Sequence, residues 1–170
     1  MLVQIISIML RNTFTTDELV ERVTLLRMYY SAVLFGSKRE ASLSDVLSGS
    51  CSDDTLQALQ LWQQQLSEAG LQPITVYEGL DSIEQEIGGL PTVTLSLPIK
   101  FSQAHLRTFG EWFRANVQPN ILLSVRTDPR MAGGCGVVWD HVFHDLSLKH
   151  HIAQHREELI AEFDKQTHGL

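Results

Sequence analysis

The stretch Thr92-Val-Thr-Leu-Ser-Leu97 decides the fold, because the periodicity of the chain changes there. Its apolar residues alternate with hydroxyl residues and Pro98 follows, a pattern typical of a β-strand with one buried face. From Thr15 to about residue 87, by contrast, apolar residues recur at the spacing of helices. The change predicts a boundary near Gly88-Gly-Leu-Pro91, with an all-α half before it and a sheet-containing half after it.

Residues 91–170 are predicted to form a small α/β module with a mixed sheet and a terminal helix. Ser102 should cap a helix, whose inner stripe is expected at Leu106, Phe109, Phe113 and Val117. A second strand is predicted over residues 121–127, and a tight hairpin around Asp140-His141. The terminal helix is predicted over residues 146–163, with four residues facing the sheet: Leu148, Ile152, Leu159 and Phe163.

Residues 1–90 are predicted to form a reduced, all-α helical bundle. Thr15 with Glu18 three positions later is typical of a capping box, so a long, largely apolar helix is expected to begin there and end near Gly36. The serine-rich residues 37–54 are expected to hold one short helix between two loops. Ser52 should cap a helix that runs to Gly70, and a further short helix is expected over residues 80–87. The fold class is therefore α+β, in two domains, 1–90 and 91–170.

The charge of the chain differs between these halves. The net charge is −7, and residues 1–90, with 5 basic and 12 acidic side chains, account for all of it, whereas residues 91–170 hold 8 of each. A nucleic-acid partner is not expected, since a protein that neutralises phosphates normally carries the opposite sign. The apolar residues 1–10 are about half the length that a helical bilayer span needs and lack a basic flank, so no membrane span or signal sequence is expected.

Three groups of residues could carry chemistry. The pairs His141/His144 and His151/His155, with Cys135 nearby, are of zinc-ligand type, but their spacing matches no established zinc motif. Gly133-Gly134 after Asp128-Pro129 suits a tight turn better than a phosphate loop, because no Gly-Lys-Ser/Thr follows. Ser147 beside Asp145 fits a helix cap better than an esterase nucleophile, since no nucleophile elbow surrounds it. No catalytic residue, metal site or cofactor is therefore expected.

The order of motifs in residues 91–163 resembles the C-terminal region of the delta subunit of rotary F-type ATP synthases. This family, which includes the mitochondrial oligomycin-sensitivity-conferring protein, has a strand, a capped helix and a second strand ending in Asp-Pro. A Gly-Gly pair, ten residues of hairpin, Asp-x-Ser and an amphipathic helix follow. The residues that match its Asp-Pro, Gly-Gly and Asp-x-Ser elements are Asp128, Pro129, Gly133, Gly134, Asp145 and Ser147.

The resemblance implies a non-catalytic stator subunit that links the catalytic head to the peripheral stalk and resists rotor torque. Its implied partners are the N-terminal helices of the alpha subunits and the b-type stalk subunits, at the cytoplasmic face of an energy-transducing membrane. The acidic half, with its apolar helix, is expected to hold the alpha-subunit helix through Leu25, Tyr29 and Phe35. The stalk is expected to contact Lys149, His150 and Arg156. The alternative is a small histidine-rich regulatory protein that binds a metal or another ligand.

Overall fold

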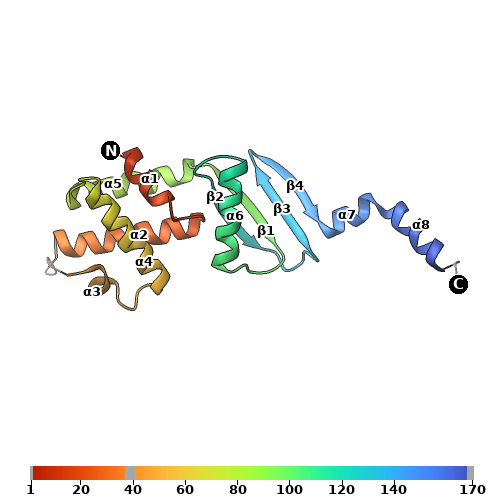
Figure 1. Ribbon diagram of the computed structural model, residues 1–170, viewed down its shortest axis with the longest axis horizontal. Coiled ribbons are helices and arrows are strands. Elements are labelled where there is room, and N and C mark those ends of the chain that lie inside the picture. The colour runs from red at the N-terminus through yellow and green to blue at the C-terminus, as the bar shows by residue number, and fades with distance from the viewer. Residues whose placement is uncertain (1, 37–40, 168–170) are drawn as a thin grey trace.

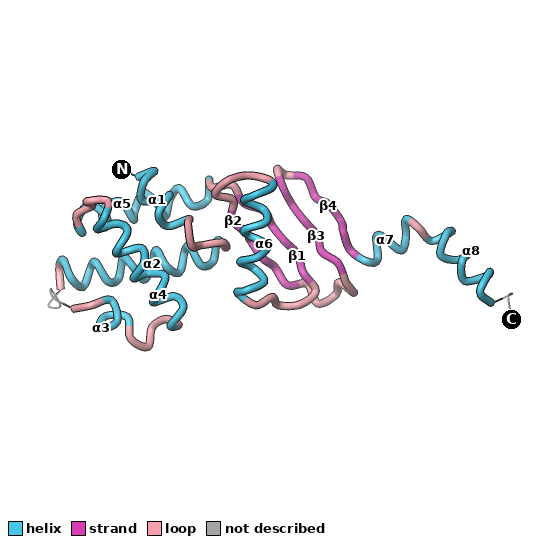
Figure 2. Tube along the Cα trace, in the orientation of Figure 1, coloured by secondary structure: helices cyan, strands magenta, loops and turns pink. Residues whose placement is uncertain are grey.

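A computed structural model describes residues 2–36 and 41–167 of the chain. A bundle of helices comes first, a four-stranded mixed sheet with one helix beside it follows, and two short helices extend from the end of the sheet (Figure 1). Figure 2 shows the same division, with every strand in the second half of the chain. The predicted α+β class, with helices first and the sheet second, is confirmed.

The first half contains five α-helices among the described residues. They are α1 (Leu2–Leu10), α2 (Thr16–Leu34), α3 (Leu43–Leu47), α4 (Asp53–Glu68) and α5 (Pro73–Glu86), followed by the 3-10 turn η1 (Ile87–Gly89). The expected short helix over residues 80–87 is wrong in length, because α5 begins at Pro73, a residue whose fixed φ suits the first helical position. The apolar residues at the start of the chain, for which no element was predicted, form α1.

The predicted caps of the bundle helices are confirmed. The Thr15 hydroxyl accepts a hydrogen bond from the Glu18 backbone N–H at 3.2 Å, and the Glu18 carboxylate accepts one from the Thr15 N–H, which completes the capping box. The Ser52 hydroxyl caps α4 by accepting a hydrogen bond from the Thr55 backbone N–H at 3.2 Å. After α4 the chain turns at Gly70, whose φ of 73° is the left-handed conformation that ends many helices. These local signals fix where the bundle helices begin and end.

The core of the bundle is built around α2, which contacts α3, α4 and α5. The largest fully buried side chains of the bundle core include Trp62, Ile5, Met9, Leu26, Leu59 and Leu80. Leu122, from the sheet, also belongs to this cluster of buried residues. The bundle core therefore reaches into the second half of the chain.

The sheet has the strand order β2-β1-β3-β4. Its strands are β1 (Thr92–Leu97), β2 (Leu122–Thr127), β3 (Gly134–Trp139) and β4 (Val142–Ser147). β1 pairs with β2 in parallel and with β3 antiparallel, and β4 pairs antiparallel with β3 and forms the edge. The alternation that predicted β1 is confirmed, since Val93, Leu95 and Leu97 are buried. The hairpin is confirmed too, because Asp140 and His141 both adopt the positive φ of a two-residue turn.

α6 (Gln103–Asn116) is capped by Ser102 as predicted, but its predicted inner stripe is only partly correct. Phe113 packs against the buried residues of the sheet, whereas Phe109 and Val117 are exposed. The buried residue of α6 is Gly110. The helix therefore turns one side toward the sheet and another, with Gly110, toward the loop between α1 and α2.

The predicted terminal helix over residues 146–163 is wrong in its start, its continuity and its packing. β4 continues through Ser147, and two helices follow, α7 (Leu148–Gln154) and α8 (Arg156–Thr167), with a non-helical ψ of 19° at His155 between them. Leu148, Ile152 and Leu159 are exposed instead of facing the sheet, and the side chain of Phe163 lies outside the described part. We call α7 and α8 together the arm, which points away from the sheet (Figure 1).

Candidate functional site

The family-like motif residues meet at one corner of the sheet. Gly134 at the start of β3 lies opposite Ser147 at the end of β4, and the Gly133 carbonyl accepts a hydrogen bond from the Leu148 N–H at 2.9 Å. The Ser147 hydroxyl accepts one from the His150 N–H and so caps α7. This corner therefore sets the direction in which the arm leaves the sheet.

Asp145 completes the corner as a carboxylate that accepts hydrogen bonds. Its Oδ1 accepts the Ser147 backbone N–H at 2.9 Å, and its Oδ2 lies 3.9 Å from His150 Nδ1. Hydrogen bonds from the side chain and backbone of Ser147, followed by the charges of His150 and Lys149, lower the pKa of Asp145. Ser147 is thus placed as a helix cap, since its neighbouring carboxylate receives the backbone N–H.

Asp128 and Pro129 form a turn that leads from β2 toward the same corner. The Asp128 carboxylate accepts the backbone N–H of Arg130 at 3.1 Å and its guanidinium Nε at 3.0 Å. The side-chain hydrogen bond from Arg130 is the main reason why the pKa of Asp128 is lowered. The Asp128 N–H donates to the carbonyl of Leu97 at the end of β1. These contacts give the Asp-Pro pair a structural role at the end of β2.

Only one glycine of the Gly-Gly pair needs an unusual backbone conformation. Among the described glycines of this module, Gly134 has a positive φ, 82°, and Gly133 does not. A Cβ on Gly134 would lie 2.2 Å from the Leu146 carbonyl oxygen, while one on Gly133 would make ordinary contacts of 3.6 Å or more with Leu148. The tight turn predicted at the Gly-Gly pair therefore has its positive φ at Gly134 and not at Gly133.

On the α6 side of the sheet, apolar residues of β3 and β4 have no described helix over them. Cys135, Val137 and Trp139 pack with the buried residues on the α6 side of the sheet. Val142 and Leu146 lie opposite Trp139 and Cys135 in the β3–β4 register, and directly opposite residues share a face of the sheet. Val142 and Leu146 are 52% and 60% exposed. We call these five residues the open sheet face; α6 crosses the β1–β2 side of the sheet and leaves β3 and β4 uncovered (Figure 1).

The bundle has an exposed apolar surface of its own along α2. Met28 is 49% exposed and Phe35, just after α2, is 66% exposed. Both line a surface pocket of about 530 Å³ together with Tyr77 of α5, whose ring meets that of Phe35 edge-on. Val20, two turns before Met28, is exposed on the same face of α2. We call Val20, Met28 and Phe35 the α2 face.

Two of the three bundle residues expected to contact a partner do not lie on this surface. Leu25 and Tyr29 are each only 6% exposed and belong to the bundle core. The Tyr29 hydroxyl accepts a hydrogen bond from Gln63 of α4 at 3.0 Å. The expectation that Leu25 and Tyr29 contact a partner is therefore withdrawn, because apolar periodicity alone does not distinguish the buried side of α2 from its open side. Phe35 remains a candidate.

The predicted stalk-contact residues lie on the arm or at its start. Lys149 and His150 are exposed in the first turn of α7, and Arg156 is exposed where α8 begins. A carboxylate oxygen of Glu158 lies 3.0 Å from His155 Nδ1, and the ring centroids of His151 and His155 lie 4.7 Å apart. In the described part of the chain, no three His, Cys, Asp or Glu side chains are grouped so as to hold a metal ion.

Sequence reasoning missed the open sheet face and Gly110. The signal for the open sheet face was that Val142, His144 and Leu146, every second residue of β4, share one side of a strand at the edge of the sheet. The signal for the second was a glycine between Leu106 and Phe113, at a position where the inner stripe of a helix would otherwise carry an apolar side chain. Both signals become clear only once the neighbouring elements are placed.

No helix within residues 2–36 and 41–167 is both long enough and apolar enough to cross a membrane. A comparison of the sequence with known protein families finds no match, and a comparison with curated proteins finds none either.

Proposed function

We propose that the chain is a stator subunit of a rotary F-type ATP synthase, of the delta-subunit kind. In this role it has no catalytic site and links the catalytic head to the peripheral stalk against the torque of the rotor. The observation that carries the proposal is the presence of two exposed apolar surfaces in different halves of an elongated molecule (Figure 1). An adaptor between two partners needs two such surfaces, and scattered single apolar residues would not provide them.

The ordered motifs support the same proposal. In the family-like pattern, Gly134 and Asp145 lie 11 residues apart. In the structure, the Gly-Gly pair and the Asp-x-Ser segment meet at the corner that sets the direction of the arm. A subunit that holds a stalk needs its contact helices in a fixed direction relative to its own sheet. The family in this proposal comes from the resemblance. The corner gives a physical reason for the motif, because the motif residues fix the direction of the arm.

The first proposed partner is an N-terminal helix of an alpha subunit, bound along the α2 face. This face carries acidic residues beside the apolar ones, since Asp17 and Glu21 are also exposed on α2. A partner helix with basic and apolar sides would be attracted by the acidic half of the chain and held by burial against Met28 and Phe35. Added salt should therefore slow its association more than it speeds its dissociation.

The second proposed partner is the end of a b-type stalk subunit. The open sheet face provides its apolar contact, and the arm, with Lys149, His150 and Arg156, provides polar contacts next to it. A helix from the stalk that lay beside α6 over β3 and β4 would bury Val142 and Leu146. Through these two partners the chain would be held peripherally at the cytoplasmic face of an energy-transducing membrane.

The proposal is tested by binding of the full chain to two peptides, one with the N-terminal helix of an F-type alpha subunit and one with the C-terminal segment of a b-type subunit. Phe35→Ser should weaken binding of the first peptide only, and Leu146→Ser should weaken binding of the second only. Ile99→Ser is the matched control, because Ile99 is 63% exposed and lies on neither surface. It should change neither affinity.

Titration calorimetry of the three variants distinguishes the outcomes. If Phe35→Ser loses affinity for the first peptide only and Leu146→Ser for the second only, the adaptor function is supported. If neither peptide binds the unmodified chain at low salt, while zinc binds stoichiometrically, the histidine-rich regulatory function replaces it.

A further inference from the structure

The loop between α1 and α2 is largely buried. We call its residues 12–15 the strap. Thr13 is fully buried, and Phe14 and Thr15 are 8% and 6% exposed. Connecting loops usually run over the surface, because their backbone polar groups need water or partners. The strap must therefore find its hydrogen-bond partners inside the protein.

Those partners come from the second half of the chain. Arg114 of α6 donates hydrogen bonds to the carbonyls of Leu10 and Thr13 across more than 100 residues of sequence, and to Ile121 at 3.1 Å. The Leu123 N–H of β2 donates to the Phe14 carbonyl at 2.8 Å, and Thr15 forms a parallel bridge with Leu123. The strap thus lies beside the β2 edge of the sheet and pairs with it through one isolated β-bridge at Thr15.

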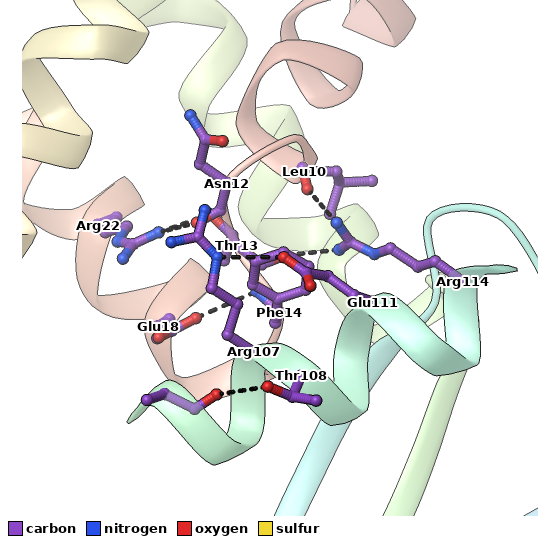
Figure 3. A network of polar contacts seen from close by, with 11 residues as sticks. Leu10, Asn12, Thr13, Phe14, Glu18, Arg22, Arg107, Thr108, Glu111 and Arg114 are labelled. Atoms are coloured by element: carbon purple, nitrogen blue, oxygen red, sulfur yellow. Dashed lines mark hydrogen bonds and ion pairs between the residues drawn. The ribbon is translucent and has the colours of Figure 1, made fainter. Parts of the chain in front are cut away.

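The bundle holds the other side of the strap. Arg22 of α2 donates to the Asn12 carbonyl at 2.7 Å and to the Thr13 hydroxyl at 2.9 Å. The Glu18 carboxylate accepts the N–H of Phe14 at 3.1 Å. Figure 3 shows the strap between α2 on one side and α6, with Arg107 and Arg114, on the other. Each half of the chain therefore holds the same short segment through charged side chains.

Phe14 fills the space beside Gly110 of α6. A Cβ on Gly110 would lie 2.5 Å from Cδ1 and 2.8 Å from the Cβ of Phe14, which is closer than real atoms approach. Rotation of the ring cannot relieve the contact with the Phe14 Cβ, because that atom is fixed to the backbone. The guanidinium of Arg114 lies over the ring, 4.6 Å from its centroid. A glycine inside a helix weakens that helix, and here it permits the contact between the halves.

We propose that the strap joins the two halves into one rigid body, and that this joint depends on Phe14 in the space left by Gly110. The inference does not rest on the proposed function. Its consequence is that a partner bound to the α2 face and one bound to the open sheet face would keep a fixed relative orientation.

The key variant is Gly110→Ala in the full chain. In an unconstrained helix interior this substitution stabilises, because alanine is the better helix former. If Phe14 occupies the space, the added Cβ instead displaces the strap and lowers the melting temperature. Gly88→Ala is the matched control, since a Cβ at Gly88 meets nothing within 4 Å, and its melting temperature should stay within a few degrees of the unmodified chain.

The double variant Phe14→Ala/Gly110→Ala separates displacement of Phe14 from general damage to α6. Without the ring, the Cβ at position 110 has room, so Gly110→Ala should no longer destabilise relative to Phe14→Ala alone. The expected result is a fall in melting temperature in the original background and a rise or no change in the Phe14→Ala background. A rise of the same size in both backgrounds would overturn the proposal.

Nuclear spin relaxation of backbone amides measures the rigid body directly. In the unmodified chain, amides of α2 and of β1 should report one common rotational correlation time, and in Gly110→Ala they should report two. Distinct correlation times for the two halves of the unmodified chain would refute the proposal even if the Phe14→Ala variants failed to fold.

Discussion

The two adjacent glycines at the sheet corner should respond oppositely to alanine. Gly134 has a φ of 82°, a conformation that costs an L-residue about 1–2 kcal/mol. The new Cβ would also lie 2.2 Å from the Leu146 carbonyl oxygen, a backbone atom of β4, so the strand itself must move. Such overpacking costs about 1–3 kcal/mol. We therefore expect Gly134→Ala to lower the free energy of unfolding by about 3 kcal/mol.

Gly133→Ala is the matched control one residue earlier. Its φ is not positive, and the new Cβ would make ordinary contacts of 3.6 and 3.7 Å with Leu148. We expect no loss of stability, and a gain of up to about 1 kcal/mol, because alanine reduces the freedom of the unfolded chain.

Urea unfolding followed by far-ultraviolet circular dichroism measures both variants. A loss of about 3 kcal/mol lowers the melting temperature of a chain of this size by about 6–12 °C, which thermal unfolding detects easily. Equal losses for Gly133→Ala and Gly134→Ala, or a change for Gly134→Ala within about 0.5 kcal/mol, would refute the reasoning about this corner.

Three further predictions follow from single contacts. Arg114→Met should lower the free energy of unfolding by about 3 kcal/mol, because the carbonyls of Leu10 and Thr13 lose charged donors. Arg130→Met, at a side chain 90% exposed, should leave the urea midpoint unchanged, and equal shifts for the two variants would contradict this. His141→Gly should raise the free energy of unfolding by about 1 kcal/mol, because His141 holds a φ of 62° that glycine adopts without strain; a lower melting temperature would count against it. The pKa of Asp145 is lower in the folded chain than in the unfolded one, so its contribution to stability is present above the unfolded pKa of about 3.9 and is lost as the pH falls through the folded pKa. Asp145→Asn should therefore flatten the dependence of the melting temperature on pH below about 4, and an unchanged profile would contradict the assignment.

Several local features could be predicted because their signals lie within a few residues of one another. Thr15 and Glu18 form the capping box, and Ser52, Ser102 and Ser147 each cap the helix that follows them. A cap depends on one side chain and the backbone three residues later. The alternation in β1 and the two-residue hairpin turn depend on equally short spacings.

Residues on helices were placed less well, because periodicity shows that a face is apolar but not which element covers it. Leu25 and Tyr29 were expected at a partner surface and lie in the core. Leu148 and Ile152 were expected against the sheet and are exposed, because the corner at Gly134 turns α7 away from it. In both cases the direction of a neighbouring element decided the outcome.

The sequence by itself determined the fold class, the caps, β1 and the hairpin, all of which arise from local spacing. Only the tertiary structure decided that Arg114 reaches Leu10, that Phe14 fills the space beside Gly110, and that the open sheet face stays uncovered. The physical reason is that these features join segments about 100 residues apart or depend on what is not packed against a face. No periodicity within either segment specifies its partner, because hydrophobic burial is non-directional until the elements are assembled.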